Sequence, residues 1–303
     1  MRNGTRRQVA AVLASAVLIV GLTPATATAA PSNTLTPQQA LDQGVADAAG
    51  DGVNQYAALV DRSTGELVAA SGGNTQVISE SIVKLFTVSY YLVKYNGTLP
   101  TSLATDLHEM IVHSNDRIES EYWTTAAVPA MAARYGLRHT ANGPKTGPHD
   151  WGWEYITADD EAMFLFKASN DPIVGPFLMD AMANVASVGA DGFDQDFGFN
   201  SLDGDHGSKQ GWTDLNSSQA INVHSVGWTD QYFGAILETS ATPRYDAMRD
   251  DSTVTADLIE GLQSQSEIAA EQTAASIRVS AVSIVSQLQG MTRHVLQVAG
   301  LIS

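Results

Sequence analysis

Residues 81–86 read Ser-Ile-Val-Lys-Leu-Phe and open an apolar segment that runs without glycine or proline to Tyr95. Its apolar spacing predicts a mostly buried helix with Ser81 in the first turn. Residues three apart share a helix face, so the Lys84 ammonium can reach the Ser81 hydroxyl. A lysine amine acts as a base where burial or a nearby cation lowers its pKa. The pair predicts a nucleophilic serine with a lysine base, although Ser-x-x-Lys alone also fits an ordinary surface helix.

Two further motifs follow in the order that this chemistry requires. Ser114-Asn115-Asp116 lies at a corner between two predicted helices, and Lys209-Gln210-Gly211 lies on a predicted strand. With Ser-x-x-Lys, the three motifs contain two of the chain's five lysines, Lys84 and Lys209. Over residues 36–239 the chain resembles the serine β-lactamase and penicillin-binding superfamily, in particular small actinobacterial-type serine hydrolases related to class A β-lactamases.

The resemblance implies a role for each motif residue. Ser81 would attack a carbonyl group and Lys84 would take its proton, while Ser114 would relay a proton to the leaving nitrogen. Lys209 would hold the substrate carboxylate and tune Ser114. The backbone N–H groups of Ser81 and Trp212 would form the oxyanion hole. No metal and no organic cofactor is needed.

Gly211 can also be interpreted without the resemblance. A glycine on an edge strand lets a ligand approach the backbone closely. A simple β-bulge explains the same glycine equally well.

Three departures from the family pattern bear on the substrate. Asp116 stands where an amide usually meets the substrate's side-chain carbonyl, and an ionised carboxylate accepts hydrogen bonds but donates none. Gln210 replaces a hydroxyl residue that helps to bind the substrate carboxylate. Residues 138–153 contain no glutamate to activate the hydrolytic water. Asp150 and Glu154 are interpreted as loop or cap residues. We therefore expect any β-lactam acyl-enzyme to persist.

The order of elements predicts an α+β, β-lactamase/transpeptidase-like fold. Strands near both chain ends would form one antiparallel sheet, with a helical subdomain inserted between them and the active site at the seam. Helices are expected over 36–49, 81–95, 103–111 and 118–135, from 157 onward and after the last strand. Strands are expected over 55–61, 66–70, 207–214, 220–228 and 232–239.

The two ends of the chain have distinct patterns. Residues 1–29 carry arginines, an apolar run too short to span a membrane and a small-residue cleavage site, which predicts a signal peptide and a secreted protein. The hydrolase domain is assigned to residues 30–262. Residues 263–303 are expected to form an amphipathic helix. Its apolar seam has heptad spacing and comprises Ala270, Ala274, Ile277, Ala281, Ile284, Leu288, Met291, Val295, Val298 and Ile302.

That seam would pack on the chain's own domain or, as a coiled coil, on a second copy, giving a homo-oligomer. Composition limits the other partners. A net charge of -17 argues against nucleic acid and anionic membranes, and the absence of cysteine excludes disulfides and a thiol nucleophile. Asp203, Asp205 and His206 are interpreted as a polar turn rather than a metal site.

Together these patterns predict a secreted acyl-serine hydrolase that acts on an amide or ester through a Ser81 ester. The expected substrate is of the peptidoglycan type or a β-lactam. The alternative is a non-catalytic binding module that keeps the fold while its C-terminal helix binds a partner. Asp116 and Gln210 favour the alternative. The intact set of Ser81, Lys84, Ser114 and Lys209 favours the enzyme.

Overall fold

A computed structural model describes residues 35–145, 147, 149–214 and 220–262, and parts of the C-terminal segment (273–274, 276–279, 281, 284–289 and 291). The expected signal peptide lies outside the described residues, as do seam positions Ala270, Val295, Val298 and Ile302. In the described part of the chain, no helix is long and apolar enough to cross a membrane.

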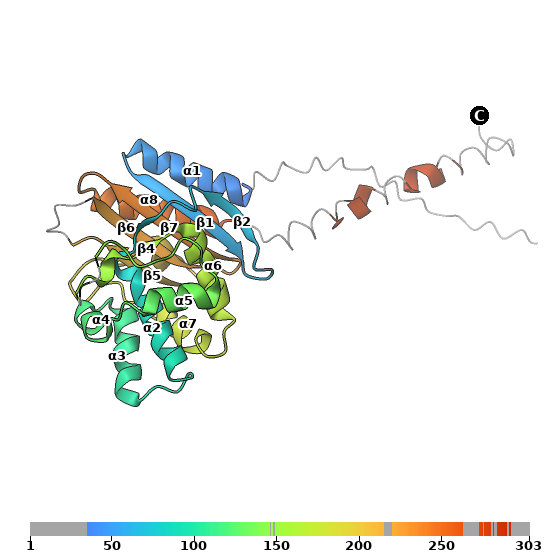
Figure 1. The fold of residues 1–303 in the computed structure, drawn as a ribbon. Helices are drawn as coiled ribbons and strands as arrows, with labels where there is room; N and C mark the ends of the chain where they lie inside the picture. The colour runs from blue at the N-terminus through green and yellow to red at the C-terminus, as the bar shows by residue number, and fades with distance from the viewer. Residues whose placement is uncertain are drawn as a thin grey trace, which may run out of the picture. The chain divides into compact units, whose positions relative to one another are not determined.

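A five-stranded antiparallel sheet organises the domain (Figure 1), with the strand order β2-β1-β7-β6-β5. The strands are β1 (Asn54–Asp61), β2 (Leu67–Ser71), β5 (Gly207–Trp212), β6 (Ile221–Trp228) and β7 (Tyr232–Ser240). β1 pairs along its whole length with β7, so the two ends of the domain meet in the centre of the sheet. The expected α+β architecture is confirmed.

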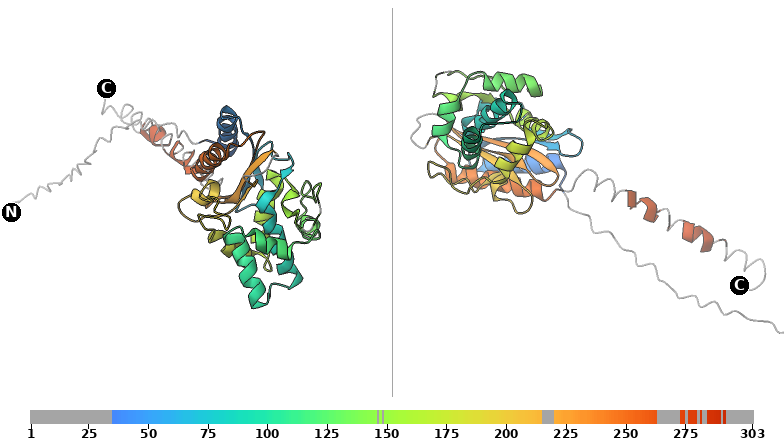
Figure 2. Two further views of the ribbon diagram at one scale, coloured as in Figure 1. Left: turned by 90° about the vertical axis from the view of Figure 1, so that its left-hand side faces the viewer. Right: turned by 90° about the horizontal axis from the view of Figure 1, so that it is seen from below.

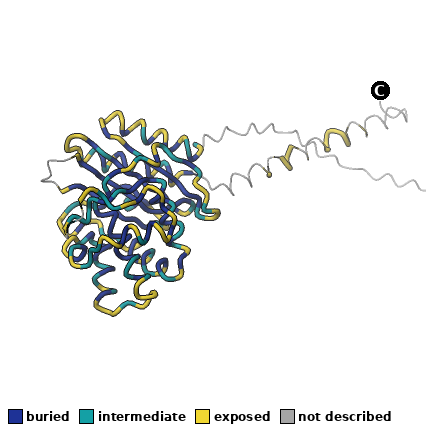
Figure 3. Tube along the Cα trace, in the orientation of Figure 1, coloured by how far each residue is buried: buried dark blue, intermediate teal, exposed yellow. Residues whose placement is uncertain are grey.

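Helices cover both faces of this sheet, as the two further views in Figure 2 also show. On one face, α1 (Pro37–Gly50) packs beside α8 (Tyr245–Glu260), and on the other lies α6 (Ala158–Ser169). In β1, Ala57 and Leu59 join the core under α1 and α8, whereas Ala58 and Val60 join the opposite core. The two-residue period of a strand thus supplies apolar side chains to both layers. Figure 3 shows the resulting buried interior.

The helical part lies between β2 and β5 in the sequence. It contains α2 (Lys84–Lys94), α3 (Thr101–Val112), α4 (Asp116–Tyr122), α5 (Ala127–Tyr135) and α7 (Gly175–Ala183), with α6 joining it to the sheet. Two 3₁₀ turns, η1 (Glu80–Val83) and η2 (Trp151–Trp153), and a small sheet of β3 (Val77–Ile78) and β4 (Tyr155–Ile156) complete it. A third 3₁₀ turn, η3 (Gly198–Ser201), packs against α8 and β6 instead. Residues 84–89 of α2 are all buried, so this helix is the core of the helical part.

Three details differ from the expected elements. The single helix over 118–135 is wrong, because α4 ends at Tyr122 and α5 begins at Ala127. Pro129 explains the break, since inside a helix its ring would clash with the carbonyl of Thr125, whereas the first turn of α5 tolerates it. In addition, α7 was not anticipated, and Ser81 lies in the 3₁₀ turn that precedes α2 rather than in α2 itself.

Candidate active site

The nucleophile segment is the 3₁₀ turn η1, which leads directly into α2 at Lys84. Lys84 Nζ donates a hydrogen bond to Ser81 Oγ, so the structure brings together the pair that the spacing predicted. Lys84 is fully buried and Ser81 is 5% exposed. Buried in this way, the amine and the hydroxyl interact more strongly than they would in water.

Ser114 lies at the corner between α3 and α4 in a left-handed conformation, with φ of 52°. Ser114 N–H donates to the Ile111 carbonyl and Asn115 N–H donates to the Met110 carbonyl. This is the Schellman arrangement that ends many helices, in which glycine usually holds the left-handed position. Asn115 then begins α4, because its side chain accepts a hydrogen bond from Ile118 N–H. The motif is therefore two helix caps joined head to tail.

Lys209 reaches the same corner from the edge strand β5. Its Nζ donates to Ser114 Oγ at 2.8 Å and to the Gln210 carbonyl at 2.6 Å. Complete burial, and secondarily the positive charge of Lys84, hold the pKa of Lys209 well below its usual range. The structure thus contains two buried serine–lysine pairs, Ser81 with Lys84 and Ser114 with Lys209.

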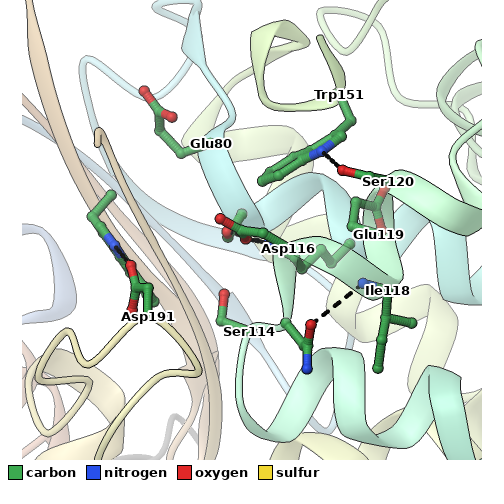
Figure 4. A network of polar contacts seen from close by, with 12 residues as sticks. Glu80, Ser114, Asp116, Ile118, Glu119, Ser120, Trp151 and Asp191 are labelled. Atoms are coloured by element: carbon green, nitrogen blue, oxygen red, sulfur yellow. Dashed lines mark hydrogen bonds and ion pairs between the residues drawn. The ribbon is translucent and has the colours of Figure 1, made fainter. Parts of the chain in front are cut away.

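Asp116 stands at the mouth of this arrangement. Its Oδ1 accepts a hydrogen bond from Lys84 Nζ at 2.7 Å, and its side chain is 57% exposed. It is the first residue of α4, where the N-terminal end of a helix favours a negative charge. In Figure 4, Asp116 lies at the centre, with Trp151 and Glu119 on one side and Asp191 on the other.

Glu119 is a buried carboxylate behind Asp116 that the sequence analysis did not identify. Its Oε1 accepts a hydrogen bond from Thr87 Oγ1 at 2.6 Å. Burial raises the pKa of Glu119 to about 7, although Lys84 and Thr87 act in the opposite direction. It lies one helical turn after Asp116, but nothing in the local pattern marks it as buried next to a lysine.

Gly211 lies where the chain closely approaches itself. A Cβ atom there would lie 3.1 Å from the Ser79 carbonyl oxygen and 3.2 Å from Ile82 N. The β5–β6 register is regular at this point, so the bulge explanation is wrong. The missing side chain lets β5 run against the backbone that carries Ser81. The next residue, Trp212, stacks its indole on Phe193 with ring centroids 4.5 Å apart.

Trp151 lies beside the site and belongs to the segment between α5 and α6. Its ring lies over Lys84 Nζ, 4.1 Å from the ring centroid, and its Nε1 donates to Ser120 Oγ at 3.0 Å. The expected loop roles of the two nearby carboxylates agree with their contacts, since Asp150 accepts from Gly147 N–H and Glu154 accepts from Gly143 N–H. The face of the Trp151 ring therefore lies next to Lys84. Asp150 and Glu154 bind the loop backbone instead. The Trp-Gly-Trp run was the only sequence signal for this contact.

Two polar side chains next to the motif residues have structural roles. Glu80, half-buried and with φ of 47°, accepts hydrogen bonds from Thr213 and Asn222, each at 2.8 Å, and so ties the nucleophile segment to the sheet. The Gln210 side chain donates to Ser208 Oγ and is completely buried. Among the described residues, no group of three or more His, Asp or Glu side chains could hold a metal ion.

Comparison with known proteins gives fold neighbours only. No protein-family model matches the chain, and no curated protein does. Among solved structures, a class A β-lactamase from Mycobacterium abscessus is 12% identical with a TM-score of 0.56, covering 73% of this chain and 97% of that one. A β-lactamase from Xanthomonas campestris is 14% identical with a TM-score of 0.58, covering 74% and 97%. One from Bacteroides cellulosilyticus is 16% identical with a TM-score of 0.55, covering 75% and 99%. The chain has the class A β-lactamase fold.

Proposed function

We propose that this protein is a secreted serine hydrolase that cleaves an amide or ester through an acyl-enzyme on Ser81. The observation that carries the proposal is the pairing of two buried lysines with two serines in one site, Lys84 with Ser81 and Lys209 with Ser114. Burying two amines is costly, and an ordinary structural role for both is hard to reconcile with that cost. The shared fold supports the same reaction class by analogy only.

In the proposed acylation, Ser81 Oγ attacks the substrate carbonyl while Lys84 Nζ takes its proton. The ammonium that forms is stabilised by Asp116 Oδ1 at 2.7 Å and by the face of Trp151. The carbonyl oxygen gains negative charge, which the N–H groups of Ser81 and Trp212 would stabilise. Ser114 then donates its hydroxyl proton to the leaving atom, because its oxygen already accepts a hydrogen bond from Lys209. The proton that Lys84 took from Ser81 then replaces the one that Ser114 gives up.

A non-catalytic binding module is the second candidate. Large apolar side chains in the C-terminal segment favour it, since Ile277, Ile284 and Met291 are 64%, 56% and 66% exposed. Exposed apolar positions at heptad spacing suit partner binding. The two candidates differ in whether Ser81 reacts.

Intact-mass spectrometry after exposure to a fluorescent penicillin and to activated esters tests the proposal. We expect a single adduct on Ser81 that is absent from Ser81→Ala. Ser89→Ala is the matched control, because Ser89 is a buried serine of α2 whose hydroxyl donates only to the Leu85 carbonyl. No adduct with any acylating agent, or one that survives Ser81→Ala, would leave the binding module as the better reading.

A further inference from the structure

One carboxylate oxygen of Asp116, at the mouth of the site, is available to accept a hydrogen bond from a ligand. Its Oδ1 accepts from Lys84, whereas no described residue donates a hydrogen bond to Oδ2, and the side chain is 57% exposed. An exposed carboxylate oxygen in a binding site is a place for a donor from the ligand. Water fills that role until a ligand with a suitable N–H group displaces it.

The position of Asp116 restricts where that donor sits on the substrate. Lys84 Nζ contacts both Ser81 Oγ and Asp116 Oδ1. Two oxygens that share one hydrogen-bonding nitrogen lie within roughly 5 Å of each other. The substrate's carbonyl carbon bonds to Ser81 Oγ, and an α-nitrogen is two bonds from that carbon. An α-amino group is therefore within reach of Asp116.

The charge of Asp116 restricts the chemistry of that nitrogen. An acylated nitrogen places a carbonyl oxygen nearby, which a carboxylate repels. A free amine is protonated near neutral pH and forms a charge-assisted hydrogen bond with a carboxylate. The two lysines of the site do not bind Asp116 Oδ2. Lys84 donates to Ser81 and to Asp116 Oδ1. Lys209 donates to Ser114 and to the Gln210 carbonyl.

The rest of the site points in the same direction. Asp191, exposed on the far side of the site in Figure 4, adds a second negative charge, and its Oδ2 accepts from Trp212 Nε1 at 3.0 Å. The buried Gln210 amide is already engaged with Ser208, so it offers no replacement for a carboxylate-binding hydroxyl. A net charge of -17 favours the approach of cationic substrates.

Building on the proposed function, we propose that the substrates are α-aminoacyl esters or amides with a free, protonated amine, and that Asp116 binds the α-ammonium. Asp116 would therefore determine specificity on the acyl side of the cleaved bond. Substrates whose α-nitrogen is acylated, as in penicillins, would acylate Ser81 more slowly. The proposal concerns the side of the substrate that stays on Ser81, so the leaving group is not restricted.

Three p-nitroanilides in both enantiomeric forms test it: alanine with a free amine, N-acetylalanine, and lactic acid, in which a hydroxyl replaces the ammonium. The first-turnover release of p-nitroaniline reports acylation alone. We expect the free amine to be preferred over both analogues by about tenfold to a hundredfold. In Asp116→Asn the preference should fall to within a few-fold. The ratio of rates is the readout, because any effect of Asp116 on Lys84 changes all three substrates together.

Glu121→Gln is the matched control. Glu121 is also on α4, its side chain is 56% exposed, and it pairs with Arg117 rather than with the site. This variant loses the same charge and should keep the wild-type preference. Asp116→Glu, which keeps the charge, should retain most of it and serves as the second variant if Asp116→Asn has a lowered melting temperature.

The possible failures are distinguishable. Ser81-dependent release with equal rates for the three substrates, or a preference that survives Asp116→Asn, would overturn the inference and leave the hydrolase proposal in place. Release that is unchanged in Ser81→Ala, or the absence of any release together with the absence of an adduct from the acylating agents, would overturn both.

Discussion

At the scale of single residues, Ser114 combines a backbone position suited to glycine with a side-chain hydroxyl that glycine lacks. Its φ of 52° is left-handed, and in that conformation a Cβ atom costs roughly 1–2 kcal/mol. The hydroxyl compensates by accepting a hydrogen bond from buried Lys209. Strain of this kind persists where surrounding contacts fix it, and such positions cluster at functional sites.

Comparing Ser114→Gly with Ser114→Ala separates the two contributions. Both variants lose the hydroxyl and should lose most of the Ser81 acylation rate. The glycine variant should nevertheless be more stable than the alanine variant by about 1 kcal/mol, because only alanine keeps a Cβ in the left-handed position. Denaturant unfolding measures the difference. Equal stabilities would mean that the backbone strain at residue 114 is negligible.

At the scale of elements, the loop that carries η2 decides what lies beside the Ser81–Lys84 pair. Ser79 binds this loop twice, because its N–H donates to the Glu154 carbonyl and its hydroxyl donates to the Gly152 carbonyl. The loop therefore presents the Trp151 ring to Lys84 rather than a carboxylate. A tryptophan cannot take a proton from water, so we expect acyl-enzyme hydrolysis to be slow.

Placing a carboxylate at this position should accelerate deacylation. We expect Trp151→Glu to shorten the lifetime of a penicillin acyl-enzyme by about tenfold or more, since a positioned general base contributes factors of this size and larger. The decay of the Ser81 adduct in intact-mass spectra measures it. Trp153→Glu is the control, because the Trp153 ring centroid lies 3.4 Å from Lys145 Nζ and not over Lys84. This variant should leave the lifetime unchanged. Rapid penicillin hydrolysis by the wild-type protein would contradict the expectation of slow deacylation.

At the scale of the whole molecule, the domain buries its own core, and the apolar C-terminal seam is a second surface that needs a partner. The described seam residues Ile277, Ile284 and Met291 are more than half exposed. We propose that a second copy covers the seam. Burial of such a stripe stabilises by several kcal/mol at about 25 cal/mol per Å² of apolar area, before the cost of ordering is subtracted.

This proposal predicts the oligomeric state. The protein lacking residues 276–303 should label at Ser81 as the full chain does. It should, however, form oligomers of fewer subunits, as measured by light scattering, or have a lower solubility. Ile284→Asp should weaken self-association, whereas Val279→Asp should not, because Val279 lies off the seam although it is 71% exposed. A full-length protein that is monomeric, with the same solubility and melting temperature as the truncated form, would end the heptad interpretation.

The elements and the motif residues could be predicted from patterns along the chain. Strand and helix periods depend on neighbouring residues along the chain, so the five strands of the main sheet and most helices were predictable. The Ser81–Lys84 contact was predictable for the same reason, since it spans a single helical turn. Even the break before α5 has a local cause in Pro129, although the prediction overlooked it.

How the motifs meet depends on the packing of the folded domain. The Lys84–Asp116 ion pair joins residues 32 apart, and the Lys209–Ser114 hydrogen bond joins residues 95 apart. Such contacts depend on how β5, α2 and α4 pack, which no local period encodes. The same packing buries Lys209 and Glu119, and so shifts their pKa values in opposite directions. Burial is a property of the assembled domain, because each side chain is withdrawn from water by segments distant in sequence.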